Sequence, residues 1–467
     1  MPFSKYLDGK RGACRALVAE LGKTFAYVGI LGTDVHTTVY RTDRRSSAIR
    51  DGEGECGFVV RLHNGRSFFE YSLSDLDGDA AALAAKITDA VRVAPSLEDR
   101  MISCPVPSDE PLKKDFLRES DFEKYSDGDI MSFCSDMRDK LLARDTRFVN
   151  AVVSVQPHSV SKLFVSKNRE LSQHYGWVNG TQFIICRDGR MVQAWEMSYS
   201  NLISEIMKDM PRRADSVCEK ALNLTHATPI EPGIYDVITD SSITGLIAHE
   251  AFGHGVEMDQ FVKDRALAKN CVGQYVASPI ANMHDGAAAA FSVASYFFDD
   301  DGVLASDTQI IKDGVLVAGL SDIASAAQLG TVPTGNGRRE SYERKVYTRM
   351  TNTYFEGAKE GVTPEDMIAS VKYGFLLESP SSGMEDPKNW GIQCMVTRAR
   401  EIKDGKLTGR VFSPIVLTGY VPDLLKSVSM MSSSLVTCGG GFCGKGYKEW
   451  VKVSDGGPYM KARIRLG

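Results

Sequence analysis

The alternation of apolar and polar residues in the first half of the chain predicts strands interspersed with helices. Strands are expected at residues 25–30, 37–40, 57–62 and 67–71, with Asn64-Gly65 as the hairpin turn between the last two. Further strands are expected at 150–155, 162–165, 182–186 and 191–196. Helices are expected at 12–22, 79–93, 127–143 and 203–224, the last interrupted at Pro211, and a proline-rich connector follows residue 93.

Strand and turn signals dominate the second half. Asp-Gly pairs at 301–302, 313–314 and 404–405 predict turns, and strands are expected at 234–239, 393–402 and 407–411. A helix over 364–373 has Thr363 at its cap and Pro364 in its first turn. Two prolines and a glycine just before residue 234 predict a domain boundary near 226–232. The expected fold is therefore α+β, with a mixed α/β domain over 1–228 and a β-rich domain over 229–467 that carries a metal-binding helix.

That helix is the segment Ser242-Ile-Thr-Gly-Leu-Ile-Ala-His-Glu-Ala-Phe-Gly-His-Gly-Val-Glu-Met-Asp259. It begins with apolar residues, and Asp240, Ser241 and Ser242 each offer an N-cap. His249 and His254 supply two nitrogen ligands, and Glu250 supplies a general base beside the first of them. The alternative is a pair of ordinary helix histidines.

The spacing of the two histidines constrains the helix. The zinc-protease signature His-Glu-x-x-His places both rings on one face, four residues apart, whereas here the second histidine comes five residues after the first. An ideal α-helix would separate the rings by roughly 140°. A π-type turn brings residues i and i+5 into line, and Gly253 and Gly255 lower the cost of such a distortion. We therefore expect the helix to widen or end between Glu250 and Gly255.

Composition narrows the class of protein. The chain has 467 residues, 43% of them hydrophobic and 25% charged, which is typical of a soluble globular protein of two domains. A net charge of -5 gives no support to nucleic-acid binding. No signal peptide or bilayer-spanning apolar stretch is evident, and the ten scattered cysteines form no Cys-x-x-Cys pair, so we expect a cytoplasmic protein with reduced thiols.

A catalytic zinc usually has three protein ligands and one open position. The glycine-rich segment Cys438-Gly-Gly-Gly-Phe-Cys-Gly-Lys-Gly446 offers two thiols as a third ligand. Three alternatives stay open from the residues alone: a phosphate-binding loop, a flexible connector, or buried inert thiols.

Most of residues 205–447 resemble the TldD/PmbA family, also called the modulator of DNA gyrase family. The resemblance is carried by His249-Glu-Ala-Phe-Gly-His-Gly-Val-Glu257, Thr334-Gly-Asn-Gly-Arg-Arg-Glu-Ser-Tyr342, Arg349-Met-Thr-Asn-Thr-Tyr354 and Phe442-Cys-Gly-Lys445. The N-terminal half is similar to the family only in its order of elements. The chain keeps His-Glu-x-x-x-His and so resembles the TldD-like metallopeptidase branch, whereas PmbA-like members have lost the motif.

The resemblance implies a site and a reaction. It places Zn²⁺ on His249, His254 and Cys443, and it makes Glu250 the base that assists the attack of a zinc-bound water on a peptide bond. It also implies unfolded or flexible peptides as substrates, in peptide maturation or clearance, and a homodimer or a heterodimer with a PmbA-like subunit. A β-rich domain is able to bind an extended peptide by strand addition.

Other residues near these motifs have two interpretations each. Glu257 and Asp259 either orient a ligand imidazole or belong to a solvated helix end. Arg338 and Arg339 either bind substrate carbonyls or a peptide C-terminus, or form ion pairs with Glu340 and Glu343.

Two further functions compete with the peptidase. One is a non-catalytic peptide-binding or partner subunit, whose structural zinc would need a fourth ligand such as Cys438. The other is a different hydrolase that uses the same zinc-bound water.

Overall fold

The structure, a computed structural model, describes residues 2–92, 101–447 and 449–467. The strands of its first half are β1 (Tyr27–Thr42), β2 (Ser47–Asp51), β3 (Glu55–His63), β4 (Phe68–Leu73), β5 (Leu112–Leu117), β6 (Phe148–Ser166), β7 (Arg169–Asp188) and β8 (Arg190–Ser200). They form one sheet in the order β4-β3-β1-β6-β7-β5, with β2 beside β1 and β8 beside β7. All neighbours are antiparallel except β5 and β7.

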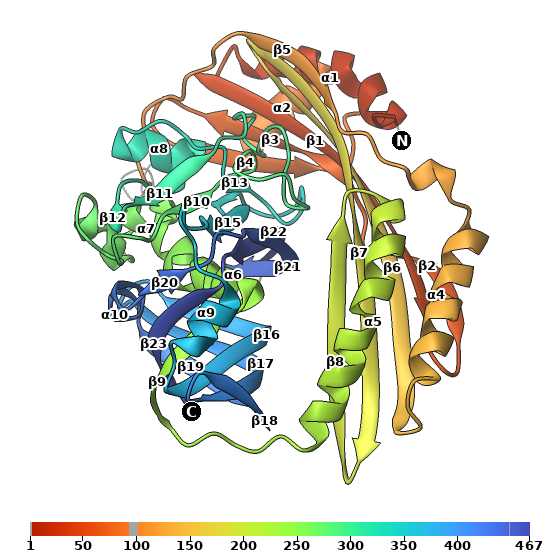
Figure 1. Cartoon of the computed structure of the whole chain (residues 1–467). Coiled ribbons are helices and arrows are strands. Elements are labelled where there is room, and N and C mark those ends of the chain that lie inside the picture. The colour runs from red at the N-terminus through yellow and green to blue at the C-terminus, as the bar shows by residue number, and fades with distance from the viewer. Residues whose placement is uncertain (1, 93–100, 448) are drawn as a thin grey trace.

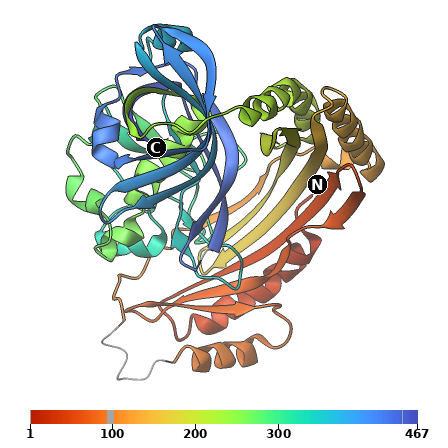
Figure 2. The same cartoon turned by 90° about the horizontal axis from the view of Figure 1, so that it is seen from below.

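Helices cover one face of this sheet, and the second half of the chain covers the other. The helices are α1 (Lys5–Leu21), α2 (Ala80–Ala90), α4 (Asp127–Leu142) and α5 (Ile203–Thr225), with a 3-10 turn at Phe122–Lys124. They bury Val28, Ile30 and Tyr40 of β1. Because side chains alternate along a strand, Leu31 lies on the opposite face, where it packs with Phe298. Figures 1 and 2 show the long strands curving along one side of the second half.

The second half contains two larger sheets and one small one. Its strands are β9 (Gly233–Thr239), β10 (Met283–Asp285), β11 (Thr308–Lys312), β12 (Val315–Leu316), β13 (Gly337–Arg338), β14 (Tyr347–Thr348), β15 (Asn352–Phe355), β16 (Tyr373–Asp386), β17 (Gly391–Lys403), β18 (Lys406–Phe412), β19 (Ile415–Tyr420), β20 (Met430–Met431), β21 (Val436–Lys445), β22 (Glu449–Gly457) and β23 (Met460–Leu466). One sheet has the order β12-β11-β10-β15-β22-β21 and the other β16-β9-β23-β19-β17-β18, with β20 beside β23, while β13 pairs with β14.

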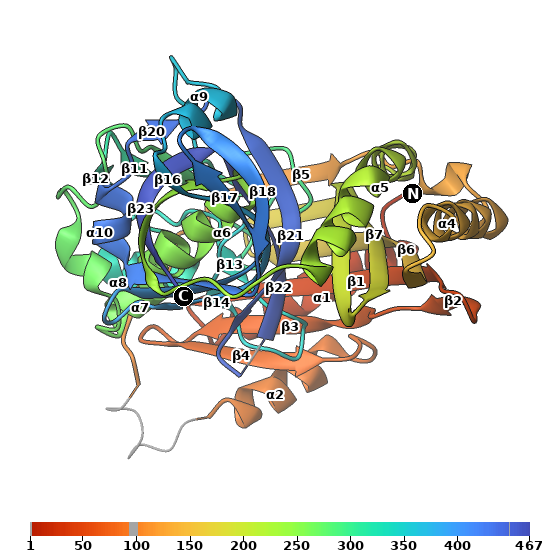
Figure 3. The same ribbon diagram turned by 60° about the horizontal axis from the view of Figure 1, so that its bottom comes forward.

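One helix lies between the two larger sheets. The helices of this half are α6 (Ser241–Ile247), α7 (Met258–Val262), α8 (Ile323–Leu329), α9 (Pro364–Ala369) and α10 (Val421–Lys426), with a π-helical turn at Ala248–Gly253 and 3-10 turns at His254–Val256 and Leu267–Cys271. Helix α6 contacts β21 and β22 of one sheet and β16, β17 and β9 of the other (Figure 3). Its fully buried residues Ile243 and Ile247 belong to the largest apolar core, so this helix is held rigidly.

Most predicted elements are confirmed, and so is the α+β class with a β-rich second half. Hairpin β3–β4, helix α4 and the strands of the second half lie where the pattern predicts them. The turns at Asp313-Gly314 and Asp404-Gly405 have two residues with positive φ, as type I′ hairpin turns require. Division into two domains at residue 228 stays a prediction.

Several element boundaries were predicted wrongly. Helix α1 begins at Lys5 rather than at residue 12, and β1, β6 and β7 are long strands of which the pattern indicated only parts. Helix α9 ends four residues early, because β16 begins at Tyr373. The predicted end of the helix at 79–93 and the start of the connector lie outside the described residues.

Helix α5 also differs from its prediction, since it continues through Pro211. Its buried residues Ile206, Met210, Ala214 and Val217 pack on β7 and β8, and this contact outweighs the local cost of the proline. None of the described helices is both long enough and apolar enough to cross a membrane.

Candidate metal centre

Side-chain hydrogen bonds just after β9 determine where helix α6 begins. Asp240 is the N-cap of α6, and its Oδ1 accepts hydrogen bonds from the backbone N of Ile243 at 2.8 Å and from Ser242 Oγ at 2.7 Å. These bonds satisfy helix-terminal donors that are buried between two sheets. Gly245 allows the close approach of α6 to β22, because a Cβ there would lie 2.5 Å from the backbone N of Gly456. The helix therefore has little freedom to shift along the strand.

The helix widens at the histidines, as the five-residue spacing predicts. The π-helical turn covers Ala248–Gly253, beginning slightly earlier than expected, and a 3-10 turn follows at His254. It brings the ring centroids of His249 and His254 to 5.2 Å. Gly253 faces Met350, and a Cβ on residue 253 would overlap the Met350 sulfur. Glycine is thus required here by close packing, since its φ of -59° is an ordinary helical value.

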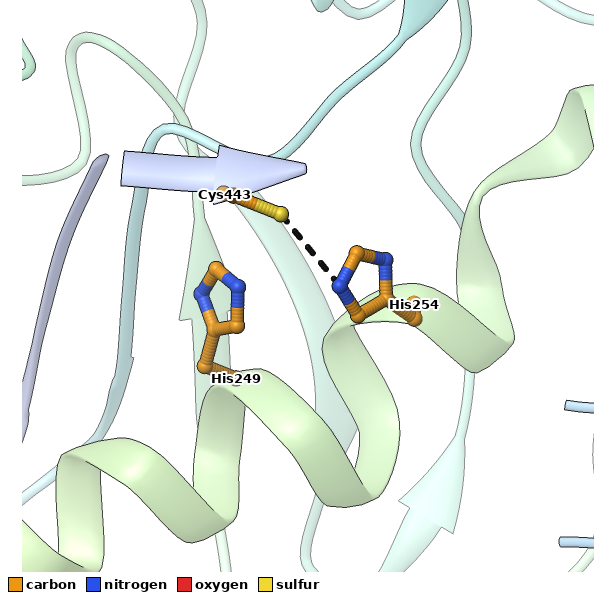
Figure 4. A group of neighbouring side chains, drawn as sticks. All are labelled: His249, His254 and Cys443. Atoms are coloured by element: carbon orange, nitrogen blue, oxygen red, sulfur yellow. Dashed lines mark hydrogen bonds between the residues drawn. The ribbon is translucent and has the colours of Figure 1, made fainter. Parts of the chain in front are cut away.

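Cys443 of β21 completes a group of three ligand atoms. Its Sγ lies 3.3 Å from His254 Nε2, and the three ligand atoms of His249, His254 and Cys443 lie within 4.8 Å of one another. Both rings extend from one helical segment toward the thiol on the strand (Figure 4). Among the described residues, these three form the group of at least three histidines, cysteines or carboxylates that lie close enough together to hold a metal ion.

The two imidazoles stabilise a thiolate at Cys443. Burial raises the pKa of the Cys443 thiol, but the two imidazoles outweigh it and hold that pKa well below its ordinary value. Burial lowers the pKa of His249, but the Cys443 thiolate outweighs it and raises that pKa to about 9. His249 Nδ1 is buried without a hydrogen-bond partner among the described residues. Two imidazoles and a thiolate form a donor set that zinc accepts, so these residues fit a zinc ion.

Glu250 lies beside this group and is largely buried. It lines a pocket of about 840 Å³ together with His249, His254 and Cys443. Gly383 of β16 packs against the Glu250 side chain, where a Cβ would overlap it. The carboxylate makes no hydrogen bond with another described residue, and it is thus available to a molecule in the pocket.

Glu257 orients one of the imidazoles. Its Oε2 lies 3.2 Å from His254 Nδ1, so His254 is held from both ring nitrogens. Lys445 donates to the same oxygen at 2.9 Å and to Asp259 Oδ1 at 2.7 Å. Within the described part of the chain, Asp259 pairs with Lys445 and Lys263 and not with an imidazole. Burial raises the pKa of Glu257, but Lys445 and His254 outweigh it and hold that pKa well below its ordinary value.

Cys438 stands apart from the three ligands. It lies on β21 opposite Asp455, before an irregularity in the pairing that runs to Gly441. It lines the same pocket, but among the described residues it does not belong to the group whose ligand atoms lie within 4.8 Å. This geometry gives no support to a structural site with four protein ligands.

Arg338 and Arg339 do not form the ion pairs considered for them. Within the described part of the chain, Arg339 pairs with Glu70 at 3.0 Å rather than with Glu340 or Glu343. Arg338 donates to the backbone carbonyls of Met350 at 2.6 Å and Lys452 at 2.7 Å. Both line a second pocket and not the one that contains His249. A role of these two residues in substrate binding stays a prediction.

Three residues at the centre were not assigned a role from the sequence. Lys445 and Arg349 belong to quoted motifs, and Arg349 donates to the carbonyl of Cys443 at 2.5 Å, so motif membership was the available signal. Glu385 of β16 lines the pocket, and both its carboxylate oxygens are buried without a hydrogen-bond partner among the described residues. Burial raises the pKa of this carboxyl well above its ordinary value. No signal in the sequence distinguishes Glu385 from the many other carboxylates.

The fold agrees with the comparisons with known proteins. The family described as PmbA/TldA metallopeptidase C-terminal domain matches residues 232–465, which is half of the chain. The chain belongs to this family, and the resemblance to TldD/PmbA proteins is confirmed.

Relatives with similar sequences are named as metalloproteases. A metalloprotease of Methanothermobacter thermautotrophicus is 27% identical over 445 residues, 92% of this chain and 93% of that protein. A zinc metalloprotease TldD homolog of Saccharolobus solfataricus is 27% identical over 251 residues, 53% of this chain and 55% of that protein. The crystal structure of TldE from Thermococcus kodakarensis has a TM-score of 0.75 at 16% identity, covering 97% of this chain and 100% of that one. That last similarity concerns the fold alone.

Proposed function

We propose that this protein is a zinc-dependent peptidase that hydrolyses unfolded or flexible peptides. The observation that carries the proposal is the convergence of His249, His254 and Cys443 beside Glu250 in one pocket. Three protein ligands with an open fourth position are typical of catalytic rather than structural zinc. Names of relatives support a metal-dependent protease, and one of those names specifies zinc.

The residues around the centre have separate roles in the proposed hydrolysis. Zinc held by the two imidazoles and the thiolate would supply a Lewis acid and lower the pKa of a bound water. Glu250 accepts the proton of the attacking water and passes it to the leaving amine, which a pocket-lining carboxylate without hydrogen bonds to other described residues is able to do. Glu257 fixes the ring of His254 through Nδ1, and this contact keeps Nε2 directed at the thiolate.

A peptide substrate has a place to bind beside Cys443. Strand β21 is the last strand of its sheet, so one side of its backbone has no neighbouring strand among the described residues. An extended peptide that pairs with this edge would run past Cys443 and the pocket, and main-chain hydrogen bonds would hold it with little regard to most side chains. We therefore expect broad specificity, and cleavage at one strict side-chain motif in a peptide library would count against this mode of binding.

The same family resemblance and the cysteines support an oligomeric state and a cellular location. We propose a dimer, formed either by two copies of this chain or with a PmbA-like subunit, and a cytoplasmic protein. Family membership supports the first, and the ten cysteines without a disulfide between any described pair are compatible with the second.

The test compares wild type with Glu250→Gln, each loaded with zinc, on a mixture of unstructured peptides followed by mass spectrometry. We expect Glu250→Gln to keep its zinc and to lose roughly 100-fold or more of the hydrolysis rate, as loss of a general base predicts. Glu205→Gln, which changes an exposed glutamate of α5, is the matched control and should behave as wild type. Undiminished hydrolysis by Glu250→Gln would overturn the assignment of the base.

A further inference from the structure

The hairpin of β21 and β22 presents two different faces. Cys443 is paired with Val451, and its neighbour Phe442 is paired with Lys452. Because successive side chains of a strand point to opposite faces, Phe442 and Lys452 lie on the face away from the two imidazoles. That face meets the N-terminal sheet, where the ring of Trp177 lies 6.1 Å from the ring of Phe442.

A second pocket, of about 700 Å³, lies on this face. It is lined by residues of β1, β6 and β7 and by residues of the hairpin, including Trp177, Phe442 and Lys452. Phe442 and Trp450 line both this pocket and the pocket at the metal centre. The two pockets therefore adjoin across the edge strand that carries Cys443.

Two cations of the second pocket have no carboxylate partner. The ammonium of Lys452 donates to the Gly439 carbonyl at 2.8 Å and lies 4.9 Å from the Trp177 ring centroid and 5.1 Å from that of Phe442. Arg338 donates only to backbone carbonyls, and in the described part of the chain neither cation lies within ion-pair distance of an acid. Buried cations are normally paired, so the buried Lys452 beside the half-buried Arg338, neither with an acid partner among the described residues, indicates a place for an anion.

The other cations that line this pocket have acid partners, and acids such as the exposed Glu53 also line it. Lys162 pairs with Asp300, and Arg339 pairs with Glu70. Glu55 accepts a hydrogen bond from the backbone N of Tyr342. Arg344 pairs with Glu340, so Lys452 and Arg338 are the lining cations that have no acid within ion-pair distance among the described residues. Burial lowers the pKa of Lys452 to about 7, although Asp455 opposes this effect and Arg338 adds to it, and a further anion beside the ammonium would raise the pKa again.

A neutral donor lies beside these cations. His158 stacks on Trp177 at 3.5 Å between ring centroids, and its Nδ1 is 2.9 Å from Thr37 Oγ1. Its Nε2 is buried and has no hydrogen-bond partner among the described residues. Burial and the charge of Lys452 lower the pKa of His158 to about 3, so the ring is neutral at physiological pH. A neutral imidazole carries one N–H, which suits an incoming oxygen.

We propose that this pocket is a subsite for a carboxylate of the peptide substrate, bound by Lys452 and Arg338 between the aromatic rings of Trp177 and Phe442. The inference rests on the proposed peptidase function, because a peptide paired with the β21 edge sends alternate side chains to the two faces of the hairpin. The carboxylate belongs either to a Glu or Asp side chain or to the C-terminus of the peptide. Each source brings a negative charge to the two unpaired cations.

The test measures binding rather than cleavage, in the zinc-loaded Glu250→Gln variant. Fluorescent unstructured peptides of one sequence, with Glu, Gln or Lys at each position in turn and with a free or amidated C-terminus, are titrated and followed by anisotropy. We expect Glu at one position, or the free C-terminus, to bind at least tenfold more tightly than its neutral counterpart. The first result assigns the subsite to a side chain and the second to the chain end.

Variants of the two cations complete the test. Lys452→Met added to Glu250→Gln should abolish the preference for the carboxylate, Lys452→Arg should retain it, and Arg338→Met should weaken it. Lys403→Met, at an exposed lysine of β17, is the matched control and should not change it. Thermal unfolding and zinc content show that each variant is folded. Equal affinity for all peptides, or a preference that survives Lys452→Met, would overturn the proposal.

Different experimental results would contradict the proposed peptidase function and the proposed carboxylate subsite. Tight carboxylate-dependent binding without hydrolysis by wild type would contradict the peptidase and leave the subsite supported. Hydrolysis by wild type with no effect of any carboxylate would support the peptidase and overturn the subsite.

Discussion

His254 is held from both ring nitrogens, by Cys443 Sγ at 3.3 Å from Nε2 and by Glu257 Oε2 at 3.2 Å from Nδ1. Glu257 is itself bound by Lys445, the lysine two residues after the thiol. One connected set of contacts thus joins the helix that carries both imidazoles to the strand that carries the thiol.

Glu257→Gln should weaken zinc binding, because an amide is a poorer acceptor for the imidazole N–H and removes the charge that binds Lys445. Loss of a partner of a metal-ligating histidine typically costs 10- to 100-fold in metal affinity, and we expect a loss in that range. Asp259→Asn, which alters contacts with Lys445 and Lys263 but not with His254, should cost less. Competition with a chromophoric chelator measures both, and equal losses would contradict the special role of Glu257.

Gly253→Ala should destabilise the protein, because the new methyl group overlaps the buried Met350 sulfur inside the π-helical turn. Overpacking of this kind costs about 1–3 kcal/mol. Gly12→Ala in α1 is the control, since nothing lies within 4 Å of a Cβ there, and it should stabilise by about 0.4–1 kcal/mol. Urea unfolding of both variants checks the prediction, which a neutral Gly253→Ala would contradict.

Arg61→Met should also destabilise, because it leaves Asp301 buried without its cation. Arg61 of β3 pairs with Asp301 of the second half, and both are almost inaccessible to solvent. Removing one partner of a buried pair costs about 3–5 kcal/mol. The double variant Arg61→Met/Asp301→Leu should recover part of the loss. If denaturant unfolding gave the same stability for wild type and Arg61→Met, the pair would contribute nothing across the contact between the halves.

The stability contributed by Glu170 should depend on pH. Hydrogen bonds from Arg15 and the nearby charges outweigh burial and lower the pKa of Glu170 to about 2. A lowered pKa stabilises the folded state above the unfolded value, about 4.3, and this contribution disappears as pH falls toward 2. The advantage of wild type over Glu170→Gln should therefore shrink between pH 6 and pH 3, measured by denaturant unfolding. The same change at the exposed Glu205 should show no such trend, and a constant advantage for Glu170 would refute the linkage.

The parts of the centre that were predictable from sequence are those with a local physical signal. The five-residue spacing of His249 and His254 required a wider helical turn, which the structure has at Ala248–Gly253. The Asp240 cap and the Asp-Gly hairpin turns were also predictable, because interactions between residues close in sequence determine them.

Other parts depend on the register of distant strands. Cys443 is 189 residues from His254, and only the resemblance to a family distinguished it from Cys438. Glu385 reaches the pocket because β16 extends past the helix, which no local pattern indicates. Pro211 was misleading because packing of the apolar face of α5 outweighs its local effect.

The most direct test of the account is the zinc content of purified protein, measured by mass spectrometry after equilibration with limiting zinc. Wild type and Cys443→Ala are compared, with Cys438→Ala as the matched control on the same strand. We predict one zinc per chain in wild type and in Cys438→Ala, and a large loss in Cys443→Ala. A chain that binds no zinc, or binds it equally well without Cys443, would contradict the assignment of His249, His254 and Cys443 as the metal centre.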